Sequence, residues 1–148
     1  YYIQKENKLI WYIFNNEFKK EGTCMKFYVC KHCGNIITFM ETKGVPVVCC
    51  GEKMSELVPG STDAATEKHV PVVHVDGNTV TVSVGSVAHP MLAEHSIKWI
   101  ILETANGFQR KNLNPGDKPE AVFALTAGEK PVAAYAFCDL HGLWSANI

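Results

Sequence analysis

The sequence predicts a mainly β protein, in which a small cysteine-rich unit precedes an immunoglobulin-like antiparallel β-sandwich. Three observations support this fold class. Four clustered cysteines and six glycine or proline residues lie between residues 25 and 60, which leaves room only for short strands and tight turns. From residue 69 onward, hydrophobic and polar residues alternate, and turns recur roughly every 10–15 residues. No long helical period interrupts this pattern, and 148 residues suffice for one ordinary domain or two small ones.

Composition and charge exclude several classes of protein. Hydrophobic residues make up 47% of the sequence and charged residues 20%, which excludes disordered and collagen-like chains. The formal net charge is −1, so the sequence has no excess of basic residues for nucleic acid. No apolar run reaches the roughly 18 residues of a membrane-spanning helix. We therefore expect neither nucleic acid nor a membrane among the partners.

The first 24 residues differ from the rest of the chain. They contain a short apolar run at 9–14, lysine and glutamate mixed on both sides of it, and no cleavage site typical of a signal peptide. Patterned sequence begins directly after Met25. We interpret residues 1–24 as a non-native or upstream extension, with an amphipathic helix as the alternative, and we expect Cys24 to be a free thiol.

Four cysteines of the next segment have the spacing of metal ligands. Cys30 and Cys33 form a C-x-x-C pair, whereas Cys49 and Cys50 are adjacent, and each pair precedes a glycine. Adjacent cysteines rarely form a disulfide without strain, and four thiolates suit Zn²⁺ or a single iron. We predict a four-sulfur metal site, with His32 exposed between two of its ligands. Because thiolates must stay reduced, a cytoplasmic location follows.

The second part of the chain contains the predicted strands. A polar connector at residues 61–68 leads into it. The strands are marked by Val80, Val82 and Val84 after a turn at Asp76-Gly77-Asn78; by Ile97, Trp99 and Ile101, alternating before Asn106-Gly107; by Phe123 and Leu125; and by residues 132–137, with Val132, Ala134 and Ala136 on one face and Ala133, Tyr135 and Phe137 on the other.

Four histidines and one further cysteine are spread through this β region. Any one histidine alone would more often be a hydrogen-bonded core or surface residue, but four of them with a C-x-x-H motif indicate a second metal site. The candidate ligands are His69, His89, His95, Cys138 and His141. His74 falls near the predicted turn, matches no motif, and is expected to be exposed.

These motifs resemble the desulfoferrodoxin family, the two-iron superoxide reductases. The resemblance runs from about Met25 to the C-terminus. Cys30-x-x-Cys33 with Cys49-Cys50 looks like the desulforedoxin-type iron site. The motifs similar to the neelaredoxin-like catalytic domain are Glu67-Lys68-His69-Val70-Pro71, Ala88-His89-Pro90-Met91, Glu94-His95-x-Ile97-x-Trp99 and Cys138-x-x-His141-Gly142-x-Trp144. The implied domains are a desulforedoxin-like iron–sulfur domain at 25–60, the connector at 61–68 and a catalytic β-sandwich at 69–148.

The resemblance also implies a reaction and its cofactors. It implies two non-haem irons per chain, one bound by the four cysteines and one by the four histidines and Cys138, although zinc stays possible in the first site. The activity is the one-electron reduction of superoxide to hydrogen peroxide, with the iron re-reduced by a rubredoxin-like electron donor. A homodimer is the family-level expectation.

Two residues beside His69 receive roles from the same resemblance. Lys68 would lie near the open position on the iron, where its charge steers superoxide and stabilises the developing peroxide. Glu67 would occupy that position once the iron is oxidised and peroxide has left. Taken alone, each is an ordinary exposed residue of a polar connector.

Three other functions remain alternatives. A non-catalytic rubredoxin-like electron carrier or metal-binding protein would explain the four cysteines but has no use for four imidazoles. A zinc-ribbon interaction domain would not explain the same histidines either, and the sequence lacks the basic or aromatic clusters expected of such a domain. A dismutase is the nearest enzyme alternative, and it would evolve oxygen from superoxide without an added reductant.

Overall fold

The computed structural model describes residues 25–148, and the expected extension at 1–24, with Cys24, lies outside them. Within 25–148, no helix has the length and apolar character needed to cross a membrane. The elements are β1 (Phe27–Val29), β2 (Ile36–Thr38), β3 (Val48–Cys49), β4 (Glu52–Lys53), β5 (Ser55–Leu57), α2 (Thr66–His69), β6 (Pro71–Asp76), β7 (Thr79–Val84), β8 (Ile97–Thr104), β9 (Gly107–Asn112), β10 (Glu120–Ala124), β11 (Pro131–Cys138) and β12 (Gly142–Asn147).

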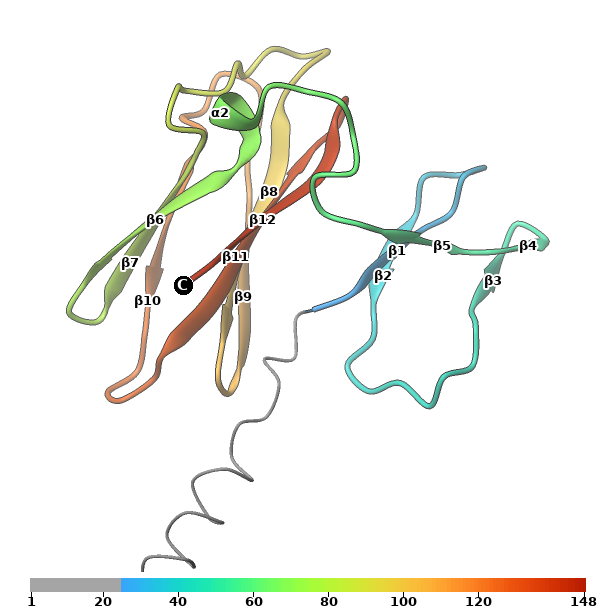
Figure 1. Cartoon of the computed structure of the whole chain (residues 1–148), viewed down its shortest axis with the longest axis horizontal. Helices are drawn as coiled ribbons and strands as arrows, with labels where there is room; N and C mark the ends of the chain where they lie inside the picture. The colour runs from blue at the N-terminus through green and yellow to red at the C-terminus, as the bar shows by residue number, and fades with distance from the viewer. Residues whose placement is uncertain (1–24) are drawn as a thin grey trace, which may run out of the picture.

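Two antiparallel sheets pack face to face and form the predicted sandwich (Figure 1). One has three strands in the order β10-β7-β6, and the other has four in the order β12-β11-β8-β9. The predicted turn after Asp76 joins β6 to β7 and pairs Asp76 with Thr79. β11 lies between β8 and β12, so the strand that ends at Cys138 is central in its sheet. The mainly β, sandwich-type fold is therefore confirmed.

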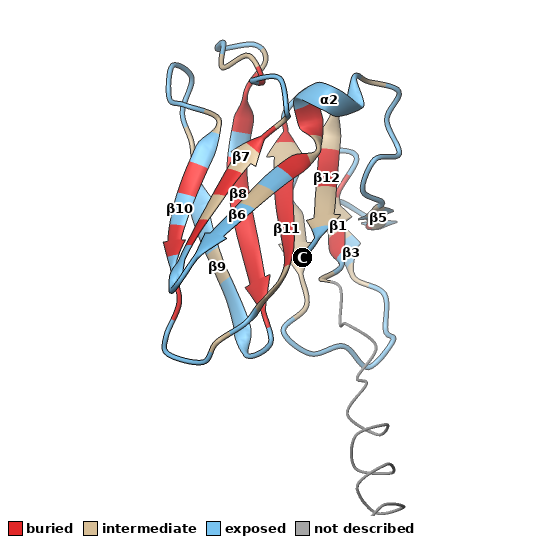
Figure 2. Cartoon of the chain, turned by 60° about the vertical axis from the view of Figure 1, so that its left-hand side comes forward, coloured by how far each residue is buried: buried red, intermediate tan, exposed pale blue. Residues whose placement is uncertain are grey.

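The core of the sandwich lies between these sheets (Figure 2). Val80, Val82 and Val84 are buried and alternate with exposed or half-buried residues of β7, as predicted. The residues that pack with them from the other sheet are Ile97, Ile100 and Leu102 of β8 and Ala134, Ala136 and Cys138 of β11. Burying each large aliphatic side chain contributes about 1.5–3 kcal/mol, so the strand ends rest on a rigid support.

The cysteine-rich unit packs on the outer face of the four-stranded sheet. Its three-stranded sheet has the order β2-β1-β5, and β3 pairs with β4 in a separate hairpin. Phe27 of β1 packs against Trp99 and Tyr135, with ring centroids 5.5 and 5.3 Å apart and ring planes inclined by 32° and 62°. Buried Glu103 accepts hydrogen bonds from the Tyr135 hydroxyl at 2.7 Å and the Met25 backbone N–H at 3.2 Å. β8 is consequently covered on both faces. Its sequence is therefore apolar on both faces and does not alternate strictly between polar and apolar residues.

One irregularity near the end of β11 corrects the predicted faces. Trp99 and Ile101 lie on the outer face, but Ile97 points into the sandwich core. The register shifts between Phe137 and Cys138, where β11 pairs with β8. The extra residue is Lys98 of β8, and this bulge turns Ile97 inward, whereas Cys138 faces the core by ordinary alternation with Ala134 and Ala136. A second shift beside Ala133 likewise places Val132 against the outer cluster, opposite to the prediction.

A one-turn helix ends the segment that the sequence predicted as a polar connector. α2 includes Glu67, Lys68 and His69, so it crosses the predicted boundary between connector and sandwich. The helix ends because Pro71 favours an extended conformation in the residue before it, and Val70 has φ −66° and ψ 125°. His69 is thereby held at the end of the sandwich at which β7 ends, β8 begins and β11 ends.

Candidate metal centres

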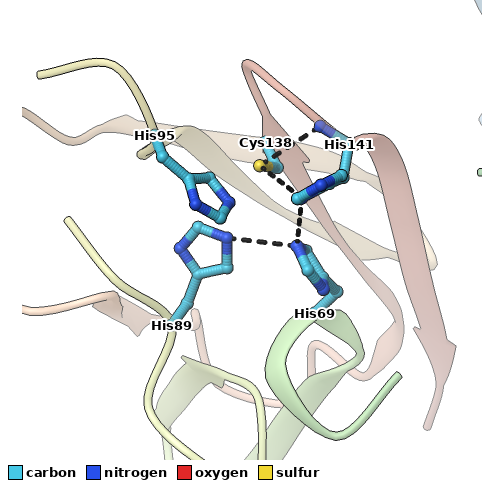
Figure 3. Close-up of side chains that lie close together, drawn as sticks. All are labelled: His69, His89, His95, Cys138 and His141. Carbon is cyan, nitrogen blue, oxygen red and sulfur yellow. Dashed lines mark hydrogen bonds between the residues drawn. The ribbon is translucent and has the colours of Figure 1, made fainter. Parts of the chain in front are cut away.

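Five predicted ligand residues lie together at one end of the sandwich (Figure 3). All their ligand atoms lie within 4.8 Å of one another. We call this set the histidine–cysteine site; it consists of His69, His89, His95, Cys138 and His141. Three segments supply them: α2, the loop from β7 to β8, and the end of β11 with the turn into β12. Residues far apart in the sequence meet here because the strand ends converge.

The four imidazoles form a closed ring in the order His69, His89, His95, His141. Neighbouring ring centroids are 4.6–4.8 Å apart, and neighbouring ring planes meet at 77–88°. Across the ring, the centroids of His69 and His95 are 6.2 Å apart and their planes are inclined by 26°. This pinwheel brings a ligand nitrogen of every ring into one small space, as the binding of a single metal ion by all four imidazoles requires.

The hydrogen bonds of the rings show that a cation fits at this centre. Nδ1 of His69 donates to the Ala65 carbonyl oxygen at 2.7 Å, and Nδ1 of His89 donates to the Pro90 carbonyl oxygen. The Nε2 lone pairs of His69 and His89 therefore face each other at 3.2 Å, where neither atom has a proton to donate. Nε2 of His95 is buried without a hydrogen-bond partner. Nε2 of His69 also lies 3.0 Å from Nδ1 of His141, and a metal ion bound among the rings would give these closely spaced nitrogens a common partner.

Cys138 adds a sulfur ligand to the four nitrogens. Its buried Sγ lies 3.8 Å from Nδ1 of His141 and accepts the His141 backbone N–H at 3.4 Å. Burial raises the pKa of the Cys138 thiol, lowers the pKa of His69, and lowers the pKa of His89 to about 4. The lowered pKa values favour neutral His69 and His89 rings that are ready to bind, whereas the Cys138 thiol ionises when a cation compensates its charge. Nitrogen and sulfur donors suit iron and similar transition metals, not Mg²⁺ or Ca²⁺.

A glycine without a ligand role fixes α2 in place. Gly85 follows β7 with φ +85°, and a Cβ there would lie 2.7 Å from the Lys68 carbonyl oxygen and 2.8 Å from that of Glu67. The Val87 backbone N–H donates to the same Glu67 oxygen at 2.9 Å. The loop that carries His89 and His95 can therefore approach the helix that carries His69 only because residue 85 has no side chain.

Glu67 and Lys68 lie beside His69 on α2, and both are exposed. The carboxylate of Glu67 acts electrostatically on the His69 ring. Neither side chain belongs to the cluster of ligand atoms among residues 25–148. The structure thus places these two predicted residues next to the site, with side chains at the molecular surface.

The four predicted cysteines form a second cluster, the four-cysteine site, with Sγ atoms within 4.8 Å of one another. Cys33 and Cys49 have their sulfurs 3.6 Å apart, and those of Cys49 and Cys50 are 4.0 Å apart. All four are free thiols. Cys30 is buried at the end of β1, whereas Cys33 and Cys50 are exposed, so this site lies at the surface.

The backbone around the adjacent cysteines is shaped for metal binding. Cys50 and Gly51 have φ values of 53° and 82° and join β3 to β4 in a type I′ turn. Within 25–148, Cys50 is the one non-glycine residue with positive φ, a strained state that a ligand role explains. Hydrogen bonds led by the Cys33 N–H lower the pKa of Cys30 to about 6, and bonding to Cys33 and Cys30 raises that of Cys50 to about 12. Without a cation, therefore, the sulfurs cannot all be thiolates.

The remaining histidines are exposed, as predicted. Nε2 of His32 lies 3.2 Å from a carboxylate oxygen of Glu52, which bridges the C-x-x-C turn and the β3–β4 hairpin. Sequence reasoning did not predict this contact, because it joins exposed residues that only the folded hairpin brings together. His74 lies on β6 and takes no part in either cluster.

Comparison with known proteins decides the family. Residues 61–147 match the desulfoferrodoxin family. The desulfoferrodoxin of Syntrophotalea carbinolica is 45% identical over 123 residues, which cover 83% of this chain and 96% of that protein. The chain belongs to the desulfoferrodoxin family. The desulfoferrodoxin of Nitratidesulfovibrio vulgaris is 46% identical over 122 residues, covering 82% of this chain and 95% of that protein. The family that the motifs resemble is therefore confirmed.

A solved structure agrees with this membership in the desulfoferrodoxin family. The crystal structure of the superoxide reductase from Treponema pallidum matches with a TM-score of 0.71 and 43% sequence identity. The match covers 84% of this chain and 99% of that chain. The chain thus has both the fold of that enzyme and two cysteine- or histidine-rich clusters consistent with iron centres.

Trp144 is a supporting residue whose role in this desulfoferrodoxin emerges from the structure. Its ring stacks on His69 with centroids 4.9 Å apart, and its Nε1–H donates to the His141 carbonyl oxygen at 3.1 Å. We expect Trp144→Ala to weaken metal binding at the histidine–cysteine site about tenfold, because such outer contacts orient ligands. Trp144→Phe keeps the stacking and should lose less. Chelator competition measures both, and equal affinity in Trp144→Ala and the unmodified protein would contradict the role.

Proposed function

We propose that this chain is a superoxide reductase that converts superoxide to hydrogen peroxide at the histidine–cysteine site. The observation that carries the proposal is the pinwheel of four imidazoles with the buried Cys138 sulfur as a fifth ligand. These five residues would hold the metal, and a six-coordinate ion would keep one position free for a small anion. Similarity to the superoxide reductase from Treponema pallidum supports this activity.

We propose non-haem iron for both clusters, with zinc as the alternative in the four-cysteine site. When bound to the histidine–cysteine site, ferrous iron supplies the one electron that, with two protons, turns superoxide into hydrogen peroxide. His69, His89, His95 and His141 hold the metal without adding charge, and the Cys138 thiolate adds one negative charge. The site therefore keeps a net positive charge when it holds a divalent ion, which favours an anionic substrate.

Lys68 is proposed to guide superoxide toward this site, and Glu67 to bind at the open position after oxidation. Lys68 is exposed and precedes a ligand on the same helical turn. We expect Lys68→Ala to lower the second-order rate with superoxide about tenfold at low ionic strength, with both metals retained. Pulse radiolysis of the iron-loaded protein measures this rate.

Two controls make this prediction specific. Lys68→Arg preserves the charge and should keep most of the rate. Lys53→Ala removes the same charge from exposed β4 in the cysteine-rich unit and should leave the rate unchanged. An unchanged rate in Lys68→Ala, or an equal loss in Lys53→Ala, would show that Lys68 does not guide the substrate.

The proposed activity itself is tested by exchanging the metal. Protein loaded with ferrous iron should consume superoxide rapidly under anaerobic conditions, and zinc-loaded protein should not, because zinc has no accessible second oxidation state. Loss of activity in His95→Ala with the four-cysteine site still loaded would assign the reaction to the histidine–cysteine site. Equal activity in His95→Ala and the unmodified protein would overturn that assignment.

Several wider features belong to the same proposal. We propose that a rubredoxin-like carrier returns the electron, that two copies form a homodimer, and that the protein protects the cytoplasm against oxidative stress, where thiolates stay reduced. The proposed domains remain 25–60, 61–68 and 69–148, preceded by the extension at 1–24. Packing of Phe27 against Trp99 joins the first of these to the last.

A further inference from the structure

A carboxylate outside the ligand set joins two ligand-bearing segments. Asp139 directly follows Cys138, and its Oδ1 accepts the Ser96 backbone N–H at 2.9 Å. Its Oδ2 accepts the Ser96 hydroxyl at 3.2 Å, and its own N–H donates to the Ser96 carbonyl oxygen at 3.1 Å. Ser96 is fully buried and directly follows His95. Three hydrogen bonds therefore fix the segment of His95 against the segment of Cys138 and His141.

The same carboxylate carries charge close to the ligands. Asp139 acts electrostatically on the Cys138 sulfur and on the His95 ring. Nζ of Lys98 lies 3.9 Å from Oδ2 of Asp139, and the two side chains are 45% and 26% exposed. Lys98 is therefore close enough to offset part of the Asp139 charge, while solvent screens the pair only in part.

We propose that Asp139 is a positioning residue that also lowers the reduction potential of iron in the histidine–cysteine site, with Lys98 limiting the effect. A fixed negative charge stabilises the more positive, oxidised state of a metal centre, and hydrogen bonds to the ligand segments fix their geometry. Asp139 touches no reacting atom. This inference shares one premise with the proposed function, namely that iron occupies the histidine–cysteine site.

Two substitutions separate charge from geometry. Asp139→Asn keeps an oxygen that can accept the Ser96 N–H but removes the charge, so the midpoint potential should rise while iron affinity is retained. Lys98→Gln removes the opposing charge, so the midpoint potential should fall. Glu56→Gln is the matched control, because Glu56 is also a carboxylate paired with a lysine, Lys26 at 3.5 Å, but lies in the cysteine-rich unit. It should leave the potential unchanged.

A third substitution tests the positioning role. Asp139→Ala removes both the charge and the hydrogen bonds, and we expect about a tenfold loss of iron affinity by chelator competition. The potential is measured by redox titration of the iron-loaded full chain, followed by the visible thiolate-to-iron absorption band. Retained affinity in Asp139→Asn together with lost affinity in Asp139→Ala supports the positioning role, and equal affinity in all variants overturns it.

The opposite signs of the two charge variants are the decisive result. An unchanged potential in Asp139→Asn, or a shift of Lys98→Gln in the same direction, overturns the tuning role. No superoxide enters these titrations, so they do not depend on the activity. A protein that shows the opposed shifts but fails to reduce superoxide would refute the proposed function and leave this inference standing.

Discussion

Gly85→Ala is expected to remove most of the metal affinity of the histidine–cysteine site, although Gly85 supplies no ligand atom. The added Cβ would lie 2.3 Å from the Val87 carbonyl oxygen, and almost as close to the carbonyl oxygens of Lys68 and Glu67. All three are backbone atoms, so the clash cannot be relieved by turning a side chain. The helix with His69 must move away from the loop with His89 and His95.

Two physical effects combine in this variant. Alanine is strained at φ +85°, and the contacts would overpack the junction, which together lower the free energy of unfolding by about 3 kcal/mol. A displaced His69 should weaken iron binding at least about tenfold. Thermal unfolding measures the first effect, and chelator competition at a temperature where the variant is folded measures the second.

Gly128→Ala is the matched control for strain alone. Gly128 has φ +82°, but a Cβ there would meet no atom within 4 Å. It should lose some stability and keep its full iron affinity. If Gly85→Ala and Gly128→Ala bound iron equally well, the close approach at Gly85 would not position the site.

Loss of the four-cysteine metal is expected to unfold the β3–β4 hairpin while the sandwich stays folded. Residues 40–46 are exposed, and β4 is exposed too, so this segment has little apolar burial to stabilise it. Metal binding to cysteine clusters contributes about 10 kcal/mol or more to folding in small units. Cys49→Ser removes the ligand whose sulfur is close to those of Cys33 and Cys50.

Amide hydrogen exchange measures the stability of the β3–β4 hairpin and of the sandwich separately. In Cys49→Ser, amides of β3 and β4 should exchange about a hundredfold faster or more, while β8 and β11 keep their protection. His89→Ala is the reciprocal control, since it should release the other metal and leave β3–β4 protected. Unchanged exchange in β3–β4 after the metal has left would show that the hairpin is stable by packing alone.

Both ligand sets could be predicted from the sequence because their information is local and chemical. C-x-x-C, the adjacent cysteines and C-x-x-H are recognisable by residue type and spacing, and the structure brings each set together. The alternation of Val80, Val82 and Val84 similarly reports one buried face of β7. These features depend little on distant parts of the chain.

Other determinants depend on contacts that spacing does not encode. The bulge at Lys98 appears only when β8 pairs with β11, and it reverses the predicted face of Ile97. Gly85 resembles an ordinary turn glycine until α2 is packed against it. Phe27 and Trp99 meet only when the cysteine-rich unit docks on the sheet. In the sequence, the contact between α2 and the loop after β7 is indicated only by Gly85 after a predicted strand and by Pro71 soon after His69.

The stoichiometry of superoxide consumption tests the central claim most directly. Protein loaded with ferrous iron is mixed anaerobically with less than one equivalent of superoxide, and hydrogen peroxide and oxygen are both measured. A superoxide reductase produces one peroxide for each superoxide consumed and releases no oxygen, with one electron lost from the protein each time. One peroxide for every two superoxides, with oxygen released and the protein still reduced, would show dismutation and contradict the account.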